Sequence, residues 1–289
     1  MDNHKRKRKS ENWLTAVLLA PTFLWFLFML ILPLVVILVF SFGERAAVGG
    51  YAGGFTFEHY ANLSSRLKAF QNTMTIAPLG TLLCLLVAYP LAYFLALRVS
   101  KKFKLILLVL VIVPFWTSLL VRTYAWIFIL GGRGIPTLLE FIGFEDVSLI
   151  NTQGAVLIGI VYGYLLLMVF PVFVSLEKLD KRLLEASNDL GASPLKTFWQ
   201  VTLPLSMPGI ATGCMLVFIL LMGEFLIPAF LGGGKVYFIG NALVDLFLQS
   251  RNWPFGAAIS VTLVAIMLIT VTFYMRMLNR KTGRDESLM

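Results

Sequence analysis

The chain has 289 residues, of which 58% are hydrophobic and 13% are charged, and its formal net charge is +9. This composition is far more apolar than that of an ordinary soluble domain. The apolar residues occur in runs of about 20 or more, the length that crosses roughly 30 Å of hydrocarbon, so the composition excludes a soluble globular protein.

The first apolar run, Trp13 to Phe42, follows a basic stretch at residues 5–9. A cleavable signal peptide has an apolar region about half as long and ends in a small-residue cleavage site, so we expect this run to remain as a membrane-spanning helix. Five further runs follow at Thr73 to Leu97, Leu105 to Leu130, Ala155 to Leu176, Ser206 to Leu231 and Phe255 to Leu278.

All six runs are predicted to be α-helices, because they are continuous, whereas a transmembrane strand alternates apolar and polar residues. Prolines interrupt most of them and favour kinks. We therefore expect an all-α, polytopic membrane protein with six transmembrane helices in residues 13–279, between a basic tail at 1–12 and a second tail at 280–289.

Lys and Arg residues are concentrated on one side of the predicted helices. Five lie in the N-terminal tail and four each in residues 98–104, 177–204 and 276–289, whereas the opposite loops together hold six. Because loops rich in Lys and Arg stay in the cytoplasm, both tails are predicted to be cytoplasmic. The same asymmetry, facing anionic lipid, accounts for the excess positive charge, so no nucleic-acid partner is expected.

The longest cytoplasmic loop, residues 177–205, has the signals of two short helices joined by a turn. Residues 178–190 favour a helix, Gly191 stands where a helix end needs a left-handed residue, and Ser193-Pro194 is a helix-start signal. An ordinary interfacial hairpin is the alternative. Apolar contacts with a partner outside the membrane are expected from Leu183, Leu184, Leu190, Leu195 and Phe198.

This loop resembles the "EAA" loop of ABC importer permeases. Glu185-Ala186, Gly191 and Leu203-Pro204 occupy the matching positions, while Ser187 replaces the second Ala. The resemblance implies a type I importer permease fold whose loop docks in a cleft of a separate ATPase and converts closure of that cleft into helix movement. The coupling residues that it implies are Glu185, Ala186, Ser187, Gly191, Leu203 and Pro204.

A narrower resemblance extends over nearly the whole chain. Residues 113–126, 175–180 and 252–258 are similar to segments of spermidine/putrescine importer permeases. This implies polyamine import across a bacterial inner membrane with a homologous second permease, two ATPase copies that bind ATP and Mg, and a periplasmic substrate-binding protein. The same machinery moving another organic cation or an iron chelate is the alternative.

Two charged residues, Arg122 and Glu224, lie well within the predicted spans. Such residues are costly in a membrane and are therefore functional candidates. We expect Arg122 to reach the outer interface or to pair with a carboxylate. Glu224 is expected either to face a wet pathway for a small cationic substrate or to form a structural pair, with Arg122 as one possible partner.

Three aromatic residues near Arg122 offer π faces that can hold an ammonium group: Trp116, Tyr124 and Trp126. We consider them candidate pathway residues. The alternative is an aromatic belt at the outer membrane interface.

Catalysis by this chain is not expected. Gly232 to Lys235 does not complete a phosphate-binding loop, because Ala229 and Val236 stand where that loop needs Gly and Ser or Thr. The histidines are isolated and both cysteines lie in apolar runs, so neither a metal site nor a cofactor is predicted. A secondary transporter or channel is a weaker alternative, because neither inverted repeats nor an intramembrane carboxylate relay is evident.

Overall fold

The computed structural model describes residues 15, 17–132, 134–143 and 147–286, with the backbone alone for 277–286. Helices dominate this part, and its strands are the two-residue pair β1 (Glu44–Arg45) and β2 (Tyr51–Ala52). The chain divides into two compact units, Met1–Ser64 with Asp245–Val264 and Ser65–Val244 with Ala265–Met289. The expected all-α membrane fold is confirmed.

The first unit contains the first apolar helix, residues 17–41, and a small hairpin. None of the most apolar part of that helix is buried, so its surface is free to meet lipid or another chain. In the hairpin, Glu44 pairs with Ala52 and Arg45 with Tyr51 in antiparallel register. The elements of this unit are η1 (Leu27–Ile31), α2 (Leu32–Ser41), β1, β2, α3 (Glu58–Ala61), the first three residues of η2 (Asn62–Arg66), η6 (Asp245–Gln249) and the start of α14 (Trp253–Glu286).

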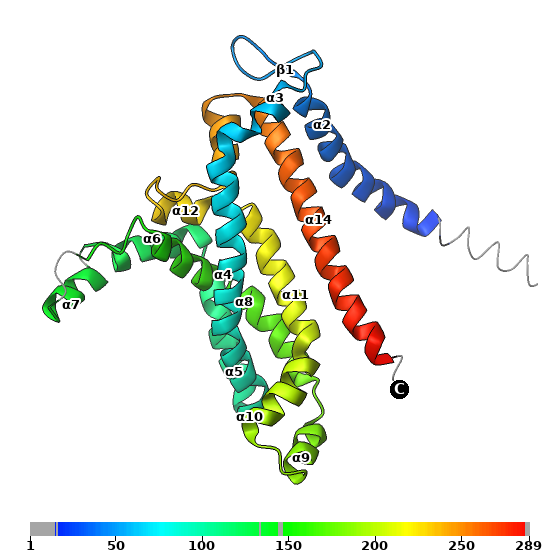
Figure 1. Ribbon diagram of the computed structural model, residues 1–289, viewed down its shortest axis with the longest axis vertical. Helices are drawn as coiled ribbons and strands as arrows, with labels where there is room; N and C mark the ends of the chain where they lie inside the picture. Colours follow the sequence, from blue (N-terminus) through cyan, green and yellow to red (C-terminus); the bar gives the residue numbers. More distant parts are fainter. Residues whose placement is uncertain (1–14, 16, 133, 144–146, 287–289) are drawn as a thin grey trace, which may run out of the picture. The chain divides into compact units, whose positions relative to one another are not determined.

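The core of the second unit consists of α4 (Leu67–Tyr93), α8 (Gln153–Glu177) and α11 (Leu203–Met222), which lie side by side (Figure 1). Small residues allow this approach: a Cβ on Gly209 would lie 2.4 Å from the carbonyl oxygen of Pro171. Such close backbone packing replaces the hydrophobic driving force that lipid removes. The other elements are η3 (Phe94–Arg98), α5 (Lys101–Ile112), η4 (Val113–Trp116), α6 (Leu119–Leu130), α7 (Ile135–Phe141), α9 (Lys181–Asp189), α10 (Pro194–Thr197), η5 (Phe198–Thr202), α12 (Leu226–Leu231) and α13 (Ile239–Val244).

Five helices of the described part are long and apolar enough to cross a membrane, and each overlaps a run predicted from the sequence. A sixth span exists if one bent pair is counted. The first run was predicted to begin at Trp13, which lies outside the described residues. The five helices are Val17–Ser41, Glu58–Arg98, Gln153–Glu177, Pro194–Met222 and Trp253–Arg276.

The run predicted at Leu105 to Leu130 is not one helix, because the chain bends by 89° between Lys101–Trp116 and Leu119–Phe141. The bend has a local cause. Pro114 cannot donate a backbone hydrogen bond, and Thr117 and Ser118 are extended, with ψ of 146° and 140°. The kink expected at a proline is therefore a complete break.

The run predicted at Ser206 to Leu231 is also divided. Helix α11 ends at Met222, residues 223–225 are not helical, and α12 then begins at Leu226. Glu224 consequently lies in a break between two helices, and not within a helix as the hydropathy pattern suggests. At the C-terminus, α14 continues to Glu286, so no helix end marks the tail predicted from residue 280.

Candidate functional site

The loop at residues 177–205 forms the two short helices that its sequence predicts. Asp180 caps α9 by accepting a hydrogen bond from the backbone N–H of Arg182 (3.0 Å), and Ser193 caps α10 by accepting one from Lys196 (3.3 Å). Gly191 has φ +77°, the left-handed conformation expected of a glycine that ends a helix. In Figure 1, α9 and α10 lie at one end of the α4, α8 and α11 bundle.

The residues that match the EAA pattern fall into two groups in this loop. Glu185, Ala186 and Gly191 are exposed on α9 and the turn, where a partner can reach them. Ser187 faces inward, and its hydroxyl lies 2.9 Å from that of Thr197 in α10. The serine that departs from the family pattern thus joins the two short helices by a hydrogen bond.

Several large apolar side chains of the loop are exposed in the described part of the chain. Leu190 is 88% exposed, and Leu183, Leu195 and Trp199 are also exposed. Such a cluster is typical of a protein-protein contact. Phe198 was expected to join this cluster. Its ring instead packs edge-on against Tyr89, with 5.7 Å between the ring centroids, and so attaches the loop to α4.

The second half of the loop is continuous with a membrane helix. Residues Pro194–Met222 form one span that includes α10, η5 and α11, and Leu203 and Pro204 lie inside it at the start of α11. The hydroxyl of Ser206 lies 3.0 Å from that of Tyr89 and fixes this start against α4. Helices α10 and α11 are therefore parts of one continuous helical span.

Glu224 lies at the far end of this span, is 5% exposed, and uses both carboxylate oxygens. Oε1 accepts hydrogen bonds from the backbone N–H groups of Phe225 (2.8 Å), Leu226 (2.7 Å) and Ile227 (3.2 Å). Oε2 accepts a hydrogen bond from the Tyr164 hydroxyl of α8. The carboxylate thus caps α12, where the helix dipole favours negative charge.

Arg122 is not the partner of Glu224. Both side chains are described, and no ion pair joins them; the Arg122 guanidinium instead lies 4.6 Å from the centre of the Phe115 ring. Its Nε and Nη1 atoms are buried and have no hydrogen-bond partner among the described residues. The structural pair that the sequence left open is therefore replaced by a cation-π contact.

The three candidate aromatic residues have different surroundings. Tyr124 packs on Phe230 of α12, with 4.9 Å between the ring centroids. Trp126 packs edge-on against Tyr162 of α8, with 5.5 Å between the ring centroids. Trp116, in the break between α5 and α6, is 81% exposed. The structure therefore brings Tyr124 and Trp126 against the helices next to Glu224 and leaves the Trp116 ring open.

Two residues of this arrangement were not found from the sequence. Tyr164 is buried in an apolar run, and its hydroxyl donates a hydrogen bond to Glu224, 60 residues away. A tyrosine in a lipid-depth run does signal a need for a partner, since a buried phenol usually finds one. Thr197 gave no such signal, because its partner Ser187 is known only once the two short helices are folded.

The chain is similar to known membrane transport proteins. Residues 88–284 match the family described as binding-protein-dependent transport system inner membrane component. The spermidine/putrescine transport system permease protein PotB of Haemophilus influenzae is 40% identical, with 94% of this chain and 97% of that protein covered. The protein of the same name from Escherichia coli is also 40% identical, with 89% and 96% covered.

Among solved structures, the chain is similar to one from a bacterial alginate ABC transporter in complex with an alginate pentasaccharide-bound periplasmic protein. The TM-score is 0.74 with 19% identity, and the match covers 96% of this chain and 97% of that one. At this identity the likeness shows a shared fold.

Proposed function

The chain belongs to the family of binding-protein-dependent transport system inner membrane components, and from this premise we propose that it imports polyamines. As a member, it is a multi-pass inner-membrane permease subunit, without catalytic activity or a cofactor of its own. The polyamine assignment is supported by the 40% identity to a spermidine/putrescine permease over nearly the full length of both chains.

The proposed coupling route runs along one continuous helix. An ATPase that closes on α9 and the exposed leucines of the loop displaces α10, which is the first turn of the span Pro194–Met222. Over 29 residues this span is about 43 Å long at 1.5 Å per residue, enough to carry the displacement across the membrane. The span ends at Met222, and Gly223 alone separates it from Glu224, which caps α12.

The proposed substrate pathway passes the break at Glu224. In this structure Oε2 of the carboxylate accepts a hydrogen bond from Tyr164, and Oε1 accepts three from the start of α12. Displacement of α12 by α11 frees an oxygen for an ammonium group. Tyr124, Trp126 and Trp116 then offer aromatic faces along the route.

The proposed partners are a homologous second permease, two copies of an ABC ATPase, a periplasmic substrate-binding protein and membrane lipid. The uncovered apolar surface of residues 17–41 supports contact with lipid or the second permease. The excess of Lys and Arg on the side of the coupling loop supports cytoplasmic termini.

Uptake by the complete importer tests the proposal. The complex is reconstituted in proteoliposomes with ATP on the ATPase side, the binding protein on the other, and labelled spermidine as substrate. We expect uptake that requires both ATP and the binding protein and that excess putrescine inhibits. Uptake of a ferric chelate or an unrelated organic cation, with no uptake of spermidine or putrescine, would contradict the polyamine assignment.

A further inference from the structure

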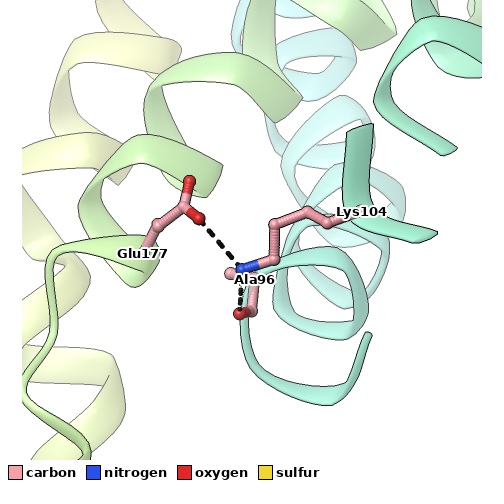
Figure 2. A network of polar contacts seen from close by, with 3 residues as sticks. All are labelled: Ala96, Lys104 and Glu177. Carbon is pink, nitrogen blue, oxygen red and sulfur yellow. Dashed lines mark hydrogen bonds and ion pairs between the residues drawn. The ribbon is translucent and has the colours of Figure 1, made fainter. Parts of the chain in front are cut away.

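A single lysine joins three helix ends beside the coupling loop. Figure 2 shows Lys104, in the first turn of α5, between Glu177 and Ala96. Its Nζ donates hydrogen bonds to Glu177 Oε1 and to the carbonyl oxygen of Ala96, both at 2.9 Å. Glu177 is the last residue of α8, and Ala96 lies in η3 at the end of the α4 span.

The two charges of this pair are placed against the dipoles of their own helices. Lys104 lies near the positive N-terminal end of α5, and Glu177 lies at the negative C-terminal end of α8. Neither residue therefore stabilises its own helix through the dipole. Their 2.9 Å contact pairs the two opposite charges.

Burial distinguishes Lys104 from the other lysines of its segment. The Lys104 side chain is 15% exposed, and its Nζ lies 5.8 Å from the Phe173 ring of α8, whereas Lys101 and Lys102 are exposed. A positive charge that only fixed the orientation of the chain would not need to be buried. Lys104 therefore contacts α8 through both its charge and the packing of its side chain.

Helix α5 has few other attachments to the core. All of α5 is described, and none of its residues is buried. It leads through η4 and the 89° break to α6, which carries Arg122, Tyr124 and Trp126. At the other end of the pair, Glu177 is separated by three residues from α9, the first helix of the coupling loop.

We infer that Lys104 and Glu177 are positioning residues that tie α5 to the coupling loop, so that movement of α9 reaches the α5 and α6 segment as well as α11. This inference rests on the proposed function. Movement of the loop is then transmitted along two routes, one through the continuous α10 to α11 helix and one through this ion pair. Without the pair, α9 moves while α5 and α6 stay behind.

Four variants of the complete complex test the tie. Lys104→Met and Glu177→Gln each remove one charge, and the exchange Lys104→Glu with Glu177→Lys restores the pair with both charges in the orientation that the helix dipoles favour. Lys102→Met removes a neighbouring exposed charge as the matched control. Two quantities are measured: basal ATP hydrolysis, which needs no substrate, and ATP-driven uptake of labelled spermidine.

We expect basal hydrolysis in each single variant to rise about fivefold, which corresponds to about 1 kcal/mol at 1.36 kcal/mol per tenfold in rate. Uptake per ATP should fall by a similar factor. The exchange should return both values to within about twofold of wild type, and Lys102→Met should not change them.

Wild-type values in both single variants, an assembled exchange variant that stays uncoupled, or loss of ATPase copurification in the single variants would each overturn the inference. Failure of the wild-type complex to take up spermidine would instead refute the proposed substrate. In that case basal hydrolysis alone decides whether the tie exists.

Discussion

Replacement of Glu224 separates its structural role from its proposed role in transport. Glu224→Ala leaves the N–H groups of Phe225, Leu226 and Ile227, at the start of α12, and the Tyr164 hydroxyl without their partner. Each unsatisfied buried group costs about 1–3 kcal/mol, and because neighbouring groups relax together we expect a total loss of roughly 3–5 kcal/mol.

Two milder variants separate the contributions of the charge and of the Tyr164 hydrogen bond to this loss of stability. Glu224→Gln keeps one oxygen for the N–H groups and loses the charge at the helix start, which we expect to cost about 1–2 kcal/mol. Tyr164→Phe removes one hydrogen bond to a carboxylate and keeps the charge, which we also expect to cost about 1–2 kcal/mol. The unfolding midpoint of the purified complex in lipid nanodiscs measures all three.

Uptake then distinguishes charge from stability. If the carboxylate is a way-station for a cation, Glu224→Gln should transport polyamine much more slowly than Tyr164→Phe, although the two are similarly stable. Equal uptake by the two variants would remove the pathway role. A midpoint for Glu224→Ala equal to that of wild type would refute the capping role on which the energies rest.

Three further predictions use residues whose surroundings are equally definite. Gly191→Val places a branched side chain at φ +77°, which costs about 1 kcal/mol or more in backbone strain, and it should weaken ATPase copurification. Gly234→Val is the control that should leave copurification unchanged, because Gly234 has a similar φ of +75° and, like Gly191, no described atom within 4 Å of its Cβ position. Arg122→Met should change the unfolding midpoint by the equivalent of no more than about 1 kcal/mol, because two buried guanidinium nitrogens have no hydrogen-bond partner among the described residues. A fall like that of Glu224→Ala would indicate a pair that the structure lacks. Gly209→Leu forces α11 away from the Pro171 carbonyl and should lower the yield of monodisperse protein, and an unchanged yield would argue against close α8 to α11 packing.

The parts of the fold that depend on local sequence could be predicted. Continuous apolar runs located the spans, and Gly191 with Ser193-Pro194 located the turn and the second helix of the coupling loop, because caps and left-handed glycines act within a few residues. Pro114 signalled a kink. Its size, 89°, depends also on the extended conformation of Thr117 and Ser118, which hydropathy does not report.

The contacts that define the site could not be predicted in the same way. The partner of Glu224 is Tyr164, 60 residues away, and the partner of Lys104 is Glu177, 73 residues away. Each pair forms only because α8 packs beside the segment concerned. From the sequence, Arg122 was as good a partner for Glu224 as any other, since charge alone was visible and the path of the broken third span was not.

Chemical access to the coupling loop tests the central claim most directly. A single cysteine is placed at Leu190, which is 88% exposed, in a chain whose Cys84 and Cys214 are replaced by alanine. An impermeant thiol reagent is then applied to either side of sealed membrane vesicles, with and without the ATPase. We predict labelling only from the cytoplasmic side and protection when the ATPase is bound; labelling from the periplasmic side, or labelling that the ATPase does not reduce, would contradict coupling through this loop.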